Sequence, residues 1–181
     1  MKPYVKLAEC KTPEGESLEL IEHDGTYMIC SQGEQLMTSF SHGSEETLAE
    51  LACSPFRPVN QARILVGGLG MGYTLAAATK ALPGKRANFI VSELTADIEK
   101  WNRTHLSHLN PGLLDDERIT IKIKPVQKLI RQASGEYHAI LLDVDNGPSA
   151  FHGKKNDAIY SLNGLREIQH ALKGGGILAV W

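Results

Sequence analysis

Hydrophobic and polar positions follow two patterns along the chain, and the change comes near residue 61. Before it, short apolar runs are separated by turn residues. Asp24-Gly25 is a strong hairpin signal, and Ser31-Gln32-Gly33 marks a second turn. We expect the runs between them to be three strands of a small antiparallel β meander, at residues 18–23, 26–30 and 35–39.

One helix is expected between the two patterns. Ser44 is a good N-cap residue, and Glu45 and Glu46 fall in the first turn, where acids favour the helix dipole. Apolar residues then follow at helical spacing. The two prolines of residues 54–60 indicate a loop or linker after this helix.

After residue 61, apolar strands alternate with helices. Strands are expected at residues 63–67, 88–93, 119–123, 138–144 and 176–181, and helices at residues 73–82, 95–105, 126–132 and 157–172. Such alternation is typical of a parallel sheet with helices on both faces and right-handed crossovers. We therefore predict an α/β fold with a doubly wound, mostly parallel sheet behind the meander.

The same patterns predict the domain organisation. We expect a β-rich element with one helix at residues 1–55 and a Rossmann-like nucleoside-binding domain at residues 61–181. Folds of this class normally add one or two strands after the fifth, which is here the run at residues 176–181. Because proteins rarely leave a strand edge bare, we expect either that C-terminal strands are missing or that a partner covers the edge.

Composition and charge exclude several classes of protein. Of 181 residues, 42% are hydrophobic and 22% charged, and the formal net charge is −2, without the concentrated basic surface typical of nucleic-acid binding. No run approaches the ~18 apolar residues that span a bilayer, and the N-terminus lacks a secretory signal. We expect a cytoplasmic protein without nucleic-acid or membrane partners.

The cysteines and histidines predict neither a disulfide nor a metal site. Cys10, Cys30 and Cys53 are widely spaced and odd in number, so they form neither a disulfide framework nor a zinc motif. His105 and His108 lie three residues apart, but no acid or cysteine completes a ligand set around them. We therefore expect reduced thiols and no metal.

The first strand of the second domain runs into a glycine-rich loop, GGLGMG, followed by a helix. Gly68, Gly70 and Gly72 form the pattern G-x-G-x-G, whereas a dinucleotide fingerprint needs a glycine at Tyr73. This pattern is typical of nucleoside sites for S-adenosylmethionine-type ligands. Glu93 ends the second strand, where an acid can accept hydrogen bonds from both ribose hydroxyls. The alternative is a turn that only packs helix against strand, with Glu93 as a solvated strand end.

Two acids, Asp143 and Asp145, follow the fourth strand in the segment LLDVDNGP. They should face the same crevice as the glycine loop, because ligands of open α/β sheets bind at the carboxyl ends of the strands. A carboxylate there can bind an ammonium group and take its proton as a sulfonium alkylates the amine. We expect both acids to be catalytic; the alternative is that Asp143 only hydrogen-bonds the backbone of the turn.

Four segments together resemble the spermidine synthase family, the aminopropyltransferases: RILVGGLGMG, VSEL with Glu93, YHAILLDVDNGP and IYSLNGLREIQHALKGGGILAVW. The resemblance covers residues 18–181 and implies a methyltransferase-like Rossmann fold behind a β meander. It implies transfer of an aminopropyl group from decarboxylated S-adenosylmethionine to a small-molecule amine, without a metal. Asp143 would be the base for the attacking amine, Glu93 would hold the ribose, and the three glycines would line the nucleoside. The resemblance also suggests a homodimer.

Two positions depart from the pattern of that family. Asn146 stands where the family has a second acid, and Pro125 where it has an acid that contacts adenine. Two other functions therefore stay open. One is a methyltransferase that uses S-adenosylmethionine in the same pocket, and the other is a non-catalytic relative that binds a nucleoside, or nothing, and acts through a partner.

Overall fold

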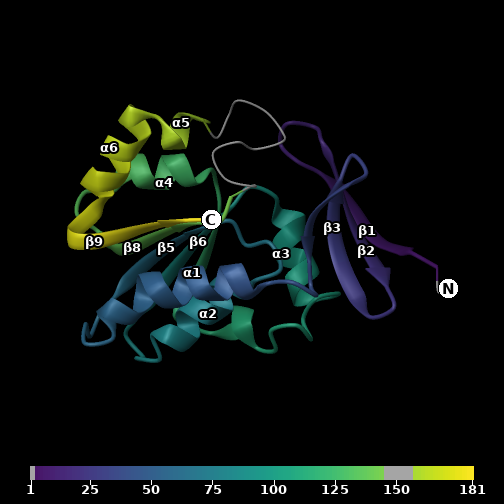
Figure 1. Ribbon diagram of the computed structural model, residues 1–181, viewed down its shortest axis with the longest axis horizontal. Helices are drawn as coiled ribbons and strands as arrows, with labels where there is room; N and C mark the ends of the chain where they lie inside the picture. The colour runs from purple at the N-terminus through teal and green to yellow at the C-terminus, as the bar shows by residue number, and fades with distance from the viewer. Residues whose placement is uncertain (1–2, 145–156) are drawn as a thin grey trace.

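The computed structural model describes residues 3–144 and 157–181, which form two β-sheets with helices around the second (Figure 1). The N-terminal sheet is antiparallel, in the order β1-β2-β3-β4. Its strands are β1 (Val5–Lys11), β2 (Ser17–His23), β3 (Thr26–Ser31) and β4 (Glu34–Thr38). The predicted meander is confirmed, with β1 as an additional strand that the sequence reading did not include.

Left-handed backbone at the turn residues makes the two tight hairpins. Asp24 and Gly25 have φ of 50° and 80°, and Gln32 and Gly33 have φ of 50° and 83°. Two consecutive residues with positive φ match the right-handed twist of the strands they join. The glycine of each pair adopts this conformation without steric cost, which explains why these two dipeptides set the register of the meander.

The second sheet is parallel throughout, in the order β7-β6-β5-β8-β9. Its strands are β5 (Arg63–Gly67), β6 (Asn88–Glu93), β7 (Ile119–Ile123), β8 (Tyr137–Leu142) and β9 (Leu172–Val180). The chain moves outward from β5 to β7 and then returns to the other side of β5. This doubly wound order confirms the predicted fold class and puts the switch point between β5 and β8.

Helices cover both faces of the parallel sheet (Figure 1). On one face lie α1 (Gly43–Cys53) and α2 (Tyr73–Ala81), and α3 (Ala96–Arg103) lies between β6 and the N-terminal sheet. On the other face lie α4 (Val126–Gln132), α5 (Asp157–Tyr160) and α6 (Leu162–Ala171). Two 3₁₀ helices, η1 (Ser54–Phe56) and η2 (Leu113–Asp115), lie in the connections.

The helix ends near Ser44 and Ser161 differ from the prediction. Ser44 is not an N-cap, because α1 begins at Gly43 and the Ser44 hydroxyl donates to Glu45 at 2.7 Å. The single helix expected at residues 157–172 is broken at Ser161, whose Oγ accepts the Gly164 N–H at 3.1 Å and caps α6. A serine in an extended conformation satisfies an orphan donor of the next helix, so it ends one helix and starts another.

Alternating side chains of β5 belong to two different hydrophobic clusters. Val66 is fully buried on the side of α1 and α2, and Leu65 is fully buried on the side of α4 and α6. The first cluster extends into the N-terminal sheet, where it includes Leu20 and Ile29. The boundary at residues 55–61 stays a prediction, but the two sheets share this core.

Strand β9 lies at one edge of the parallel sheet, and no strand of the described ranges pairs with its outer side. Val180 and Trp181, at its end, are 37% and 44% exposed. Within residues 3–144 and 157–181, every helix is too short or too polar to cross a membrane.

Candidate functional site

The glycine-rich loop lies where the sequence predicts, between the end of β5 and the start of α2. Gly68, Gly70 and Gly72 all have left-handed backbone, with φ of 87°, 50° and 85°. Only glycine adopts this conformation freely. The loop is thus a tight turn at the carboxyl edge of the sheet, and Gly72 is the N-cap residue of α2.

The protein itself approaches each of these glycines closely. A Cβ atom on Gly68 would lie 2.3 Å from the main-chain oxygen of Asp143, and one on Gly70 would lie 2.9 Å from the sulfur of Met37. On Gly72 it would lie 3.2 Å from Leu113. The positive φ at all three positions, together with the main-chain contact at Gly68, therefore favours glycine in this loop whether or not a ligand binds.

Glu93 extends from the end of β6 to the glycine loop. Its Oε2 accepts the Leu69 N–H at 3.0 Å, and its Oε1 accepts the N–H groups of Leu94 and Thr95 at 2.7 and 3.0 Å. Burial raises the pKa of Glu93, and the hydrogen bonds from these N–H groups and from Gly70 lower it in part. Glu93 is therefore not a solvated strand end.

The same carboxylate takes the place of a helix cap. Thr95 is the N-cap residue of α3, but its side chain makes no capping hydrogen bond. Oε1 of Glu93 accepts the Thr95 N–H instead. One side chain thus holds both the glycine loop and the first turn of α3.

One N–H of the loop has a much weaker acceptor than the others. Main-chain carbonyl oxygens accept the N–H groups of Gly68 and Gly72, both at 2.8 Å. The Met71 N–H donates to the Met37 sulfur at 3.2 Å. Because a thioether is a weak acceptor, the Met71 N–H is the donor that a ligand could most easily take over.

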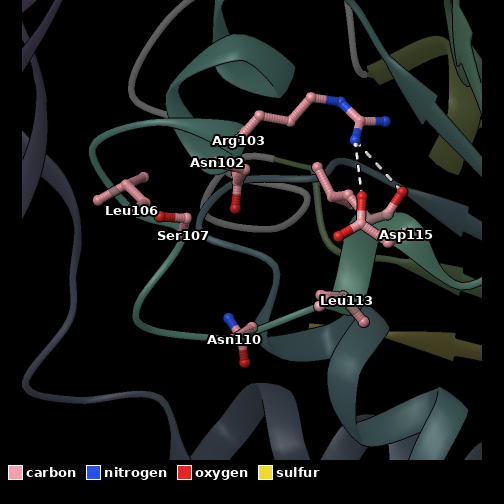
Figure 2. A pocket seen from close by; sticks show the side chains of 9 residues that line it. Asn102, Arg103, Leu106, Ser107, Asn110, Leu113 and Asp115 are labelled. Carbon is pink, nitrogen blue, oxygen red and sulfur yellow. Dashed lines mark hydrogen bonds and ion pairs between the residues drawn. The ribbon is translucent and has the colours of Figure 1, made fainter.

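Two asparagine side chains donate hydrogen bonds to carbonyl oxygens of the glycine loop. Asn102 Nδ2 donates to the Gly70 carbonyl at 2.8 Å, and Asn110 Nδ2 donates to the Met71 carbonyl at 3.0 Å. Both line a surface pocket of about 100 Å³ at the end of α3, across which Arg103 pairs with Asp115 at 3.6 Å (Figure 2). The sequence reading missed both asparagines, and only the polar Asn102 on an apolar face of a helix could have indicated one of them.

Asp143 lies directly after β8, beside the glycine loop. Its N–H donates to the Gly67 carbonyl at 3.0 Å, and its carboxylate accepts a hydrogen bond from the Thr74 hydroxyl in the first turn of α2. Burial raises the pKa of Asp143, the Thr74 hydrogen bond lowers it in part, and the nearby Glu45 carboxylate raises it further. Asp145, the second predicted catalytic acid, lies outside the described residues.

Glu45 is a second carboxylate near Asp143 that the sequence reading treated only as a first-turn acid. It is 8% exposed, and the Ser44 hydroxyl donates to it at 2.7 Å. Beside it, the ring of His42 stacks on Tyr73 with 4.0 Å between ring centroids. The starts of α1 and α2 therefore bring a buried acid, an aromatic pair and Asp143 together.

No group of three or more His, Cys, Asp or Glu side chains in the described part of the chain is placed to hold a metal ion. His108, one of the two histidines considered in the sequence, packs its ring against Tyr27 at 4.8 Å between centroids. The three cysteines are free thiols. Burial raises the pKa of Cys53 to about 12 and that of Cys10 to about 11, so both are protonated at neutral pH.

Three solved structures that match this fold are described as spermidine synthases, one of them as a probable one. A spermidine synthase in complex with the transition state analogue AdoDATO superimposes with a TM-score of 0.75 over 97% of this chain, at 18% identity. This chain has a spermidine synthase-like fold. The spermidine synthase from Thermotoga maritima matches with a TM-score of 0.73 over 97% of the chain, at 19% identity. A probable spermidine synthase from Corynebacterium glutamicum ATCC 13032 matches with a TM-score of 0.66 over 99%, at 15% identity.

The likeness is one of fold. The chain covers 55%, 56% and 64% of these three structures, and so spans less than two thirds of a solved spermidine synthase-like chain. No protein-family model and no curated protein sequence matches it. What the site does must therefore be argued from its own residues.

Proposed function

We propose that the chain is the nucleoside-binding part of an aminopropyltransferase-like enzyme. The donor would be decarboxylated S-adenosylmethionine, bound across the ends of β5 and β6, and the acceptor a small-molecule amine. The observation that carries this proposal is the position of Glu93 and Asp143 at the ends of β6 and β8, on either side of the glycine loop. The proposed protein is a cytoplasmic homodimer that needs no metal.

The proposed ribose contact is the Glu93 carboxylate. Main-chain N–H groups of Leu69, Gly70, Leu94 and Thr95 hold it against the loop and use the about four lone-pair sites of its two oxygens, so ribose hydroxyls would take the place of one or more of these N–H donors. Two exposed apolar side chains flank it. Leu94 is 44% exposed and Ile123, opposite Glu93 in the neighbouring strand, is 43% exposed, and both would give an adenine ring an apolar surface.

The proposed amine contact is the pair of carboxylates Asp143 and Glu45. Two acids in a partly buried site favour a cation, since each charge needs a compensating partner there. Asp143 would bind the ammonium group of the acceptor and take its proton as the new carbon–nitrogen bond forms. Its raised pKa supports that role, because a base works best when its pKa approaches the working pH.

A binding experiment tests the nucleoside site more directly than an activity assay does. The chain covers only part of the solved spermidine synthases, and nucleoside binding does not require a complete active site. We expect 5′-methylthioadenosine, the nucleoside left after aminopropyl transfer, to bind in isothermal titration calorimetry. Glu93→Gln should weaken binding by about tenfold or more, as expected for losing a hydrogen bond to a charged group. Glu117→Gln, at an exposed carboxylate in the loop before β7, is the matched control. No binding by the unaltered protein would refute the proposal.

A transfer assay tests the amine site. With decarboxylated S-adenosylmethionine and a diamine, Asp143→Asn should lower the rate by about 10²–10⁴-fold, the usual contribution of a general base. Transfer that is unaffected by Asp143→Asn would remove Asp143 from the mechanism. Preference for S-adenosylmethionine as donor would instead favour a methyltransferase.

Two observations favour another candidate, a non-catalytic relative. The Met37 side chain lies over Gly70, in space that a ligand's sulfur end could otherwise use, and Glu93 is already bonded to the loop. Such a protein would keep the fold and act through a partner. This candidate would be supported over the enzyme if 5′-methylthioadenosine, decarboxylated S-adenosylmethionine and S-adenosylmethionine all fail to bind. The protein must then also show a cooperative thermal unfolding transition, which proves that it is folded.

A further inference from the structure

Met37 joins the N-terminal sheet to the glycine loop. It lies in β4, and its sulfur accepts the Met71 N–H at 3.2 Å and lies over Gly70. Every other contact made by the loop's N–H groups is to a main-chain oxygen or to Glu93. The N-terminal sheet therefore contributes one side chain to the proposed ligand site, and this side chain is apolar.

A β-bulge in β4 aims Met37 at the loop. The pairing with β3 passes from Ile29 opposite Met37 to Cys30 opposite Gln35, which leaves Leu36 as an extra residue. Such bulges re-aim the neighbouring side chain and often occur next to binding sites. Met37 also packs against the shared hydrophobic core, so moving it away from the loop would expose apolar surface.

We propose that Met37 selects the donor, by favouring decarboxylated S-adenosylmethionine over S-adenosylmethionine. This inference rests on the proposed function, because it concerns the same nucleoside site. The two donors share their adenosine and sulfonium and differ by one carboxylate on the arm beyond the sulfur. That carboxylate needs hydrogen-bond donors, and the Met71 N–H is the one most easily freed.

Met37 withholds this donor. To reach the Met71 N–H, the carboxylate of S-adenosylmethionine must displace a side chain that is held by β4 and by the core. If it does not, it lacks this donor and meets the carboxylates of Asp143 and Glu45, which repel it. The decarboxylated arm carries only an ammonium group, so it meets neither obstacle and is attracted by both acids.

The test compares donor affinities in Met37 variants by isothermal titration calorimetry, with 5′-methylthioadenosine as the common nucleoside. The unaltered protein should bind decarboxylated S-adenosylmethionine at least about tenfold more tightly than S-adenosylmethionine, since a hydrogen bond to a charged group is worth about that much. Met37→Ala frees the N–H and should reduce this ratio by about tenfold, through tighter binding of S-adenosylmethionine. The affinity for 5′-methylthioadenosine, which lacks the arm beyond the sulfur, measures how the truncation affects the part of the site that both donors share.

Two further variants keep the result decisive. Met37→Leu preserves the side-chain volume, and hence folding, but removes the sulfur, so the ratio should fall here too, though less than with alanine. Met28→Ala makes the same truncation one strand away, in β3, and should leave the ratio unchanged. If 5′-methylthioadenosine binds but neither Met37 variant changes the ratio, the role of Met37 is refuted and the nucleoside site stands. If 5′-methylthioadenosine does not bind, both fail.

Discussion

Gly68→Ala tests whether the first glycine of the loop is fixed by the protein's own backbone. Gly68 has a φ of +87°, and an added Cβ would lie 2.3 Å from the main-chain oxygen of Asp143. The N–H of the same residue donates to the Gly67 carbonyl at 3.0 Å, so relief of the clash requires separating the ends of β5 and β8. The structure offers a matched control in Gly15, which has a φ of +89° and no atom within 4 Å of an added Cβ.

The two substitutions should differ by the cost of the clash. A non-glycine residue in left-handed backbone costs about 1–2 kcal/mol, and this applies to both positions. Forcing atoms into packed space costs about 1–3 kcal/mol more, and this applies only to Gly68. For a protein of this size each kcal/mol lowers the melting temperature by about 2–4 °C. We expect a decrease of roughly 10 °C for Gly68→Ala and roughly 4 °C for Gly15→Ala.

Thermal unfolding followed by circular dichroism measures both decreases, and chemical denaturation at constant temperature gives the free energies. Equal decreases for the two variants would refute the reasoning. They would mean that the Asp143 peptide moves aside at no cost, and that Gly68 is free to meet a ligand. A larger effect at Gly68 would show that this glycine is needed for folding, independently of any nucleoside.

Two more predictions concern stability. Asp143 has a folded-state pKa above its unfolded value, so the folded protein binds more protons and loses stability as the pH rises through that range; Asp143→Asn removes this loss. Chemical denaturation at about pH 4 and about pH 7 should therefore show that Asp143→Asn is more stable, relative to the unaltered protein, at the higher pH. The same difference in unfolding free energy at both pH values would contradict the raised pKa of Asp143. Ser161→Ala removes the cap of α6 and should cost about 1 kcal/mol in chemical denaturation, whereas Ser134→Ala, in a loop, should cost little.

Local patterns predicted the parallel sheet well. Strands β5, β6 and β7 have the predicted bounds, because each is a short apolar run between a loop and a turn. Strand β1 was missed because its sequence, VKLAECK, mixes charged with apolar residues and carries no turn signal of its own. Its place depends on pairing with β2, which is a contact between segments and not a local preference.

The site shows the same limit more clearly. The positions of Glu93 and Asp143 follow from the rule that strand ends meet at one edge of a sheet, so both could be predicted. The sulfur of Met37 over the loop could not, because it depends on how the N-terminal sheet docks and on a bulge in β4. Nor could the asparagine contacts behind the loop, which join residues more than thirty positions apart.

The double role of Glu93 has a consequence for motion. Because one carboxylate accepts both the Leu69 N–H and the Thr95 N–H, rotation of that single side chain releases these two N–H groups together. Hydrogen–deuterium exchange at these two amides, in segments of the chain far apart in sequence, should then follow a common opening rate. A nucleoside that hydrogen-bonds to the carboxylate would change the exchange rates of both amides together.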